Sequence, residues 1–428
     1  AGAHEAAMVA LASPGAAERH DLCDQCLWLL GNIAGDGDVA LRDALFAAGV
    51  MEALGLLFMQ MPAFSWSVQE RAQVLRTLTW LMGSLCRGIP APALADVECC
   101  FDYFAQVLMG SDDAQMLHEA LWGLCYLMEG ASNEEDCSAR AERILSIDFG
   151  EGEARDPAEP HPLLSQVVCF ARRAAQDLRS PLRVPALRLL GLLVATTVPE
   201  VTDAAVASGA VQAFRLVLRD AKASDAVRRD AAWALSNIAA GTKDQAVAVL
   251  SDAAASDALF AVVEQGASHA VRRESAWAVV ALATQLGFEA QGAVALDARR
   301  VLALATAMLR DDRGEAALQR ALLDAAELVL RHGDGVARAQ GLKANPMVRL
   351  GEEVGLLDEL EELLRGSEPG LQRKAQLLTT RFGAGPENRL PDKGGSFGSK
   401  TPQNAAWGTP SAISGGSPTR RVAYRFGA

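Results

Sequence analysis

One helical face of the segment VRRDAAWALSNIAAGT, residues 227–242, carries a carboxylate, an indole and a carboxamide. Asp230, Trp233 and Asn237 follow one another at intervals of three and four residues, which places their side chains on one face of an α-helix. An indole attracts lysine and arginine through cation–π contacts of about 0.5–2 kcal/mol each, and a carboxylate pairs with their charged heads. A carboxamide both donates to and accepts from an extended peptide backbone. This face therefore predicts binding of a peptide rich in lysine and arginine.

Each of these residues also has an ordinary structural interpretation. A single tryptophan on an apolar helix commonly packs into a core, and an asparagine near a helix end commonly caps it. Asn32 and Asn237 both lie within one turn of a glycine, Gly35 and Gly241 respectively. We expect Gly241 to end its helix in the left-handed conformation. One helix by itself leaves both interpretations open.

The same pattern recurs along the chain, and this recurrence favours the binding interpretation. Aligned helical segments place a tryptophan or a substitute at seven marker positions, which are Trp28, Trp80, Trp122, Arg188, Trp233, Trp277 and Asp324. The intervals between them are 52, 42, 66, 45, 44 and 47 residues. Such a period is typical of armadillo or HEAT arrays, in which each unit of two or three helices stacks on the next. Three of the segments also carry an acid three residues before the tryptophan, namely Glu119, Asp230 and Glu274.

The elements that position these residues are therefore predicted to be all α-helical. We expect an armadillo-repeat, right-handed superhelical solenoid over residues 1–383, in which the marker helices line one concave surface. The long interval within 131–162 contains an inserted acidic loop with the sequence DFGEGEARDPAEPHP. Residues 384–428 are rich in Gly, Ser and Pro and are predicted to form a disordered C-terminal tail.

Composition limits the classes of partner. Half of the 428 residues are hydrophobic and only 5% are aromatic, which favours helices over sheets. No run of about 18 uncharged apolar residues predicts a membrane span, and no secretory signal is evident. The net charge is −13, made up of +4 in residues 384–428 and −17 before them. An acidic body argues against direct binding of nucleic acid and permits a basic ligand.

Neither catalysis nor a cofactor is predicted. The chain contains a lone C-x-x-C, Cys23 to Cys26, without the second pair or histidine cluster that a zinc site needs. The eight cysteines are therefore expected to be reduced thiols, which suits a cytosolic or nuclear compartment. The six histidines are dispersed, and neither a nucleophile elbow, a Walker loop nor a dinucleotide fingerprint occurs.

Several stretches together resemble the importin-α (karyopherin-α) family, the armadillo adaptors that carry proteins with nuclear localisation signals (NLSs) into the nucleus. These stretches are LWLLGNIAGDGDVALRD, TLTWLMGSLCRGIPAP, PALRLLGLLVATT, RRDAAWALSNIAAGT and NPMVRLGEEVGLLDELEEL. The resemblance covers residues 1–383. It implies a nuclear import adaptor without enzymatic activity that binds NLSs in an acidic, Trp- and Asn-lined groove and is found in cytoplasm and nucleus.

The resemblance also implies two cargo sites in that groove. The major site would consist of Gln25, Trp28, Asn32, Asp36, Trp80, Ser84, Glu119 and Trp122. The minor site would consist of Arg188, Asp230, Trp233, Asn237, Glu274 and Trp277. Three positions depart from the family pattern, because Ser84, Leu192 and Ala281 stand where the family has polar groups, mostly asparagine. Of these only Ser84 retains a hydrogen-bonding side chain.

The implied partners are NLS-bearing cargo, importin-β and a nuclear export receptor at the C-terminal repeats, with neither direct nucleic-acid nor membrane contact. The resemblance places Ala1 near the end of the second repeat. The basic segment that recruits importin-β is therefore absent from this chain and expected earlier in a longer parent. An armadillo scaffold without a transport role is the alternative; adhesion-type grooves of this fold are basic, whereas this register supplies Asp and Glu.

Overall fold

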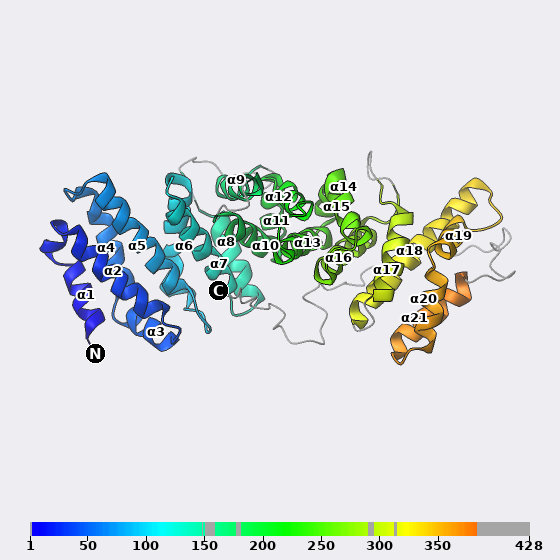
Figure 1. Ribbon diagram of the computed structural model, residues 1–428, viewed down its shortest axis with the longest axis horizontal. Helices are drawn as coiled ribbons and strands as arrows, with labels where there is room; N and C mark the ends of the chain where they lie inside the picture. The colour runs from blue at the N-terminus through cyan, green and yellow to red at the C-terminus, as the bar shows by residue number, and fades with distance from the viewer. Residues whose placement is uncertain are drawn as a thin grey trace. The chain divides into compact units, whose positions relative to one another are not determined.

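The computed structural model describes residues 2–147, 149, 159–176, 181–289, 295–311 and 315–382, apart from the side chains of 14, 17 and 173–176. Every regular element within these ranges is a helix and none is a strand, which confirms the predicted all-α class (Figure 1). The chain divides into two compact units, Ala1–Ala210 and Val211–Ala428. The two units are described separately below.

The first unit contains eleven described α-helices and two short 3₁₀ helices. They are α1 (Ala3–Leu11), η1 (Pro14–Ala17), α2 (His20–Gly35), α3 (Val39–Ala47), α4 (Val50–Gln60), η2 (Met61–Ala63), α5 (Val68–Cys86), α6 (Leu94–Gly110), α7 (Ala114–Glu129), α8 (Glu134–Leu145), α9 (Pro162–Gln176), α10 (Arg183–Val194) and α11 (Pro199–Ala207).

The boundary between the two units falls at the start of α12, and the second unit continues from there. Its described helices are α12 (Ala210–Leu218), α13 (Asp225–Ala240), α14 (Lys243–Ser251), α15 (Ala253–Glu264), α16 (His269–Leu286), α17 (Ala298–Asp311), α18 (Ala316–Gln340), α19 (Pro346–Glu353), α20 (Leu356–Arg365) and α21 (Pro369–Phe382).

The seven marker positions all fall on helices, which we term the marker helices: α2, α5, α7 and α10 in the first unit, and α13, α16 and α18 in the second. In the first unit α2 packs on α5, α5 on α7, and α7 on α10. In the second unit α13 packs on α16, and α16 on α18. The marker helices of each unit thus form a row in chain order, as Figure 1 shows.

Local sequence signals explain where the marker helices begin. Ser67 and Glu70 form a capping box at the start of α5, in which each side chain accepts a bond from the other residue's backbone N–H. Asp113 caps α7 by accepting from two backbone N–H groups, and Ser224 caps α13. The buried face of α13 is mostly alanine, with Leu235 and Ile238, and this small-residue surface lets α16 approach closely.

The end of α13 differs from the expectation. Gly241 has φ −74° and ψ −132°, so it is not left-handed. A Cβ there would lie 1.9 Å from Oε1 of Gln245, so a larger residue would force the end of the Gln245 side chain to move. That oxygen accepts a hydrogen bond from the backbone N–H of Thr242 in the capping box of α14. The limited space beside Gln245, and not the φ angle, therefore favours glycine at position 241.

Two expected segments fall largely outside the described residues. Within the interval 131–162, α8 occupies Glu134–Leu145, while residues 148 and 150–158 of the predicted acidic loop are not described. The predicted tail, residues 384–428, also lies outside the described ranges. Among the helices that are described, none is by itself long and apolar enough to cross a membrane; three sharply bent pairs satisfy the length and composition criteria jointly.

Candidate peptide-binding surfaces

The predicted major-site residues lie on three consecutive marker helices of the first unit. Trp28 on α2 is 56% exposed, whereas Trp80 on α5 and Trp122 on α7 are half-buried. Gln25, Asn32 and Asp36 are exposed on α2, and Ser84 is buried on α5. Packing of α2 on α5 and of α5 on α7 brings these residues onto one row.

The Trp80 indole of α5 packs directly against Gly31 of α2. A Cβ added at Gly31 of α2 would lie 2.1 Å from Cζ3 of the Trp80 indole. The indole therefore rests on the bare backbone of the neighbouring marker helix and leaves part of its surface to solvent. Trp28 has no such cover, so the two indoles differ in how much of the ring a ligand can reach.

The polar side chains beside these indoles bond to their own helices. Nδ2 of Asn32 donates to the Trp28 carbonyl at 2.8 Å, and Oγ of Ser84 donates to the Trp80 carbonyl at 3.0 Å. These bonds run back one turn, which serine and asparagine side chains commonly do inside helices. Asn32 keeps its carboxamide oxygen for a ligand, but one of the two N–H donors of its amide is already engaged.

The second unit contains the most complete predicted set. Asp230, Trp233 and Asn237 lie on α13, with Glu274 and Trp277 on the adjacent α16. Both indoles are half-buried. Nδ2 of Asn237 is buried and has no hydrogen-bond partner among the described residues, in contrast to Nδ2 of Asn32. A buried amide donor without a partner is unfavourable, and a ligand carbonyl would satisfy it only after the carboxamide turned to bring Nδ2 to the surface.

The carboxylates of this set are already paired, which the sequence interpretation did not anticipate. Oδ1 of Asp230 accepts from Nη2 of Arg229 at 2.7 Å, and Oε1 of Glu274 accepts from Nη2 of Arg273 at 2.6 Å. Arg273 also contacts Glu315 at 3.3 Å. The two acids expected to hold cargo cations therefore carry their own arginines, so the surface is less acidic than predicted.

Arg188 belongs to the first unit, whereas the other five predicted minor-site residues belong to the second. Its side chain is 9% exposed and contacts Oε1 of Glu129 on α7 through both Nε and Nη2 at 2.7 Å. Burial together with this pairing makes Arg188 a link between α7 and α10. Asp324, the last marker position, pairs with Lys374 of α21 at 2.5 Å.

Comparisons with known proteins support the armadillo-repeat fold. Residues 199–240 match the family model for the Armadillo/beta-catenin-like repeat. Importin subunit alpha-1b of Oryza sativa subsp. japonica is 32% identical over 114 residues, which cover 27% of this chain and 20% of the rice protein. Importin subunit alpha-9 of Arabidopsis thaliana is 25% identical over 227 residues, covering 52% and 37% respectively.

The chain is an importin-α-like armadillo-repeat protein. Its matched segments span less than half of the length of either relative. A crystal structure of an engineered protein is similar in fold, with a TM-score of 0.56, 17% sequence identity and coverage of 87% of each chain. At that identity the likeness concerns the fold alone.

Two residues beside the predicted major-site residues were missed by the sequence analysis. The Tyr126 ring stacks on Trp122 with centroids 5.8 Å apart and planes at 21°. The exposed Arg87, at the end of α5, donates to the Gly35 carbonyl at 3.3 Å, and its positive charge opposes the rise that burial causes in the pKa of Tyr126. Spacing could have found Tyr126, since residues four apart meet on a helix. Nothing local marks Arg87, because its partners lie on two other helices.

Burial and the charge of Arg87 act in opposite directions on the titratable groups beside Trp122. Burial raises the pKa of the Glu119 carboxyl above its usual value, and the positive charge of Arg87 opposes that shift. Burial likewise raises the pKa of Tyr126. The loop that carries Arg87 is fixed by the buried Arg42, whose Nη1 donates to the carbonyls of Arg87 at 2.9 Å and Pro90 at 3.0 Å.

The residue types that ligate metals are dispersed over the described ranges. No group of three or more His, Cys, Asp or Glu side chains there could hold a metal ion, and all eight cysteines are free thiols. The described surface offers indoles, amides and paired charges, which are groups that bind peptides.

Proposed function

We propose that this chain is a nuclear import adaptor that binds lysine- and arginine-rich NLSs on the marker helices. The names of its relatives, which are importin α subunits, support this role. In this proposal cargo proteins bind the Trp-bearing rows, importin-β and an export receptor are further partners, and the protein moves between cytoplasm and nucleus. Because the chain spans only part of those relatives, these partners belong to the proposal.

One observation carries the proposal: the unpartnered amide of Asn237 lies one turn from Trp233. The Trp233 ring offers a face for the alkyl stem and charge of a lysine. The Nδ2 group of Asn237 is buried and has no internal acceptor among the described residues, so rotation of the carboxamide would bring a free donor to the peptide carbonyl. A bound extended peptide satisfies both groups at the same time.

The test is a binding measurement with the intact chain. A fluorescein-labelled peptide Gly-Lys-Lys-Lys-Arg-Lys-Gly should bind, and its anisotropy signal should fall as salt rises. Trp233→Ala and Trp28→Ala should each weaken binding about tenfold, the equivalent of one lost cation–π contact of about 1.4 kcal/mol. The same peptide with glutamate at every basic position is the control. Binding that neither substitution alters would remove the proposal.

A second candidate is an armadillo scaffold without a transport role, and the Arg–acid pairs of the second unit favour it. Arg229 and Arg273 neutralise Asp230 and Glu274, so a ligand there need not be strongly basic. Under this alternative the acidic control peptide would bind at least as well as the lysine-rich peptide. Under the import proposal the lysine-rich peptide displaces or outcompetes these arginines.

A further inference from the structure

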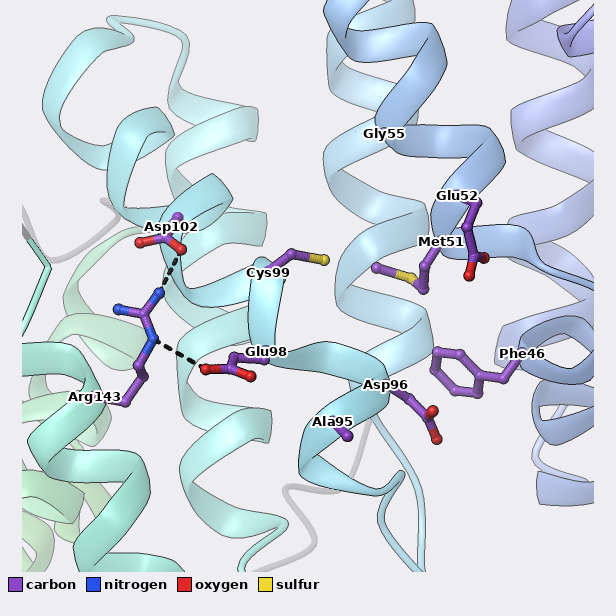
Figure 2. A pocket seen from close by; sticks show the side chains of 10 residues that line it. All are labelled: Phe46, Met51, Glu52, Gly55, Ala95, Asp96, Glu98, Cys99, Asp102 and Arg143. Atoms are coloured by element: carbon purple, nitrogen blue, oxygen red, sulfur yellow. Dashed lines mark hydrogen bonds and ion pairs between the residues drawn. The ribbon is translucent and has the colours of Figure 1, made fainter.

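An open cleft lies in the first unit, outside the row of marker helices. Its walls are α3 and α4 on one side and α6 on the other, with Arg143 of α8 at one end (Figure 2). Its volume is about 640 Å³. The side chains of Met51 and Cys99 extend towards each other from opposite walls. All of its lining residues lie within the described part of the chain.

One end of the cleft is already filled by a guanidinium group. Arg143 forms an ion pair with Asp102, and its Nε lies 3.8 Å from Oε1 of Glu98. Figure 2 shows this arginine between the two carboxylates of α6. The two carboxylates at this end of the cleft therefore already have a cationic partner. The same contacts show that the α6 wall can bind a guanidinium group.

The other end has the same kind of lining but no cation. Glu52 and Asp96 are exposed, and neither has an ion-pair partner among the described residues. The half-buried Phe46 lies close to both in Figure 2, and Met51 completes an apolar floor. An aromatic ring flanked by two carboxylates attracts a cation through the ring face and through both charges.

The second unit contains the same combination with its cation in place. Arg300 lies 4.4 Å over the centre of the Phe260 ring. Its Nη1 donates to Asp257 at 2.7 Å and its Nε to Glu264 at 2.8 Å. Phenylalanine, aspartate and glutamate thus form a guanidinium site in this chain, and the ligand is the chain's own arginine.

The two places correspond in the repeat at the position of the cation, although Phe46 lies on α3 and Phe260 on α15, the helix directly before a marker helix. Arg300 is the third residue of α17, and Asp96 is the third residue of α6. Each of these helices directly follows a marker helix, α16 and α5 respectively, and leads to the next. At this position the second unit has Arg300, which is the cation of its site, whereas the first unit has the carboxylate of Asp96. The site in the first unit thus has two carboxylates, like the site of Arg300, but lacks an internal cation.

The helix dipole gives the plainest alternative explanation of the acids. Asp96 and Glu52 lie in the first turns of α6 and α4, where a negative charge stabilises a helix by about 0.3–1 kcal/mol. That effect explains one acid on each helix. It does not explain the open volume between them or the ring of Phe46 beside both.

We propose that this end of the cleft, formed by Phe46, Glu52 and Asp96, is a docking site for one arginine side chain of a partner protein. The guanidinium lies over Phe46 between the two carboxylates, as Arg300 lies over Phe260. The aliphatic stem of the arginine packs on Met51. This site is separate from the marker helices and does not depend on the function proposed for them.

Cys99 provides a direct reporter, because it lines the cleft and is the exposed thiol among the eight cysteines. In the intact chain, the rate of Cys99 alkylation by iodoacetamide is measured by mass spectrometry with and without millimolar Ac-Ala-Arg-Ala-amide. The peptide should slow alkylation of Cys99 and not of the half-buried Cys169. Ac-Ala-citrulline-Ala-amide, which has the same shape without the charge, should give no protection.

Variants locate the effect. Asp96→Arg supplies the cation from within, as Arg300 does, and should abolish protection; Asp96→Asn should weaken the peptide about tenfold. Gly55→Trp is a second route, because a Cβ at Gly55 meets nothing within 4 Å and the indole would fill the cleft. Trp233→Ala should leave protection unchanged, which separates this site from the marker helices. Equal protection by the citrulline peptide, or full protection in both Asp96→Arg and Gly55→Trp, would overturn the proposal.

Discussion

The indole of Trp80 rests directly on the backbone of Gly31, so that a Cβ at Gly31 would lie only 2.1 Å from the ring. These residues are on adjacent marker helices, α5 and α2. The contact fixes how closely the two helices approach, and it fixes the side of the Trp80 ring that remains for a ligand. Packing and the candidate peptide surface are therefore set by the same pair.

The Gly31→Ala substitution should destabilise the chain by about 1–3 kcal/mol, because overpacking forces the indole or the helix to move. Gly55→Ala on α4 is the matched control, since it also lies within a helix and its added Cβ meets nothing within 4 Å. The control should be neutral or stabilising by up to about 1 kcal/mol. Urea unfolding of both variants measures the difference. Equal free energies of unfolding would show that the Trp80 contact is unimportant.

The two asparagines should respond in opposite ways to removal of the amide. Asn32→Ala breaks a formed bond to the Trp28 carbonyl and should lower the stability of the free chain by about 0.5–1 kcal/mol. Asn237→Ala removes a buried donor without a partner, so the free chain should be equally or more stable. Thermal unfolding measures both effects.

Binding of the lysine-rich peptide should respond differently from stability, because the Asn237 amide then gains a partner. Asn237→Ala should weaken the peptide five- to tenfold, corresponding to one hydrogen bond of about 1–1.4 kcal/mol. Anisotropy titrations of both variants provide the readout. A loss of free-chain stability in Asn237→Ala would mean that its amide has a partner in solution.

Peptide binding to the first unit should depend on pH through Glu119. Burial raises the pKa of this carboxyl, so as the pH falls it takes up a proton before ordinary carboxylates do. A protonated Glu119 no longer attracts a lysine, and affinity should decline starting above the usual glutamate pKa of about 4.3. Affinity measured from pH 7 to pH 4.5 tests this.

Glu119→Gln should remove the early decline in affinity. Because the pKa of Glu119 is raised in the folded chain, its ionised form destabilises the folded chain at neutral pH. Glu119→Gln should therefore not lower the free energy of unfolding there. If wild type and variant lose affinity in parallel as the pH falls, another group is responsible.

An ion-pair cluster joins α18 to α21 and should make stability depend on pH. Lys374 lies 2.5 Å from both Asp324 and Glu327. Burial acts against charge on both Lys374 and Glu327, yet their bonds prevail and raise the pKa of Lys374 while lowering that of Glu327. Lys374→Met should therefore lower the free energy of unfolding by about 1–3 kcal/mol at pH 7.

The pH dependence of that loss follows from the two shifts. The stabilisation through Glu327 is complete above the unfolded pKa of about 4.3 and disappears as the pH falls through the lower folded value. That through Lys374 is complete below about 10.4 and disappears as the pH rises through the higher folded value. The difference between wild type and Lys374→Met should thus be constant near neutrality and shrink at both extremes. Denaturant unfolding at pH 3, 7 and 11 measures it.

Much of the fold could be predicted because it depends on local pattern. The Trp-centred segments recur at armadillo spacing, and each marker position falls on a helix. Caps such as Ser67 with Glu70 and Ser224 are local too, since the bonding groups are three residues apart. The candidate site residues were placed on successive helices for the same reason.

The sequence by itself determined the helices, the repeat and the residues that each marker helix presents. Tertiary structure alone decided which of those residues are available. Arg229 and Arg273 each form an ion pair with the acid that follows them in the sequence. Adjacent residues of a helix do not face each other, so the long arginine side chain must bend to make this contact. The contacts of Trp80 with Gly31 and of Arg87 with the Gly35 carbonyl join distant segments, and distant segments also form the cleft beside Phe46 and Asp96. Such contacts depend on how whole helices pack, which no local spacing encodes.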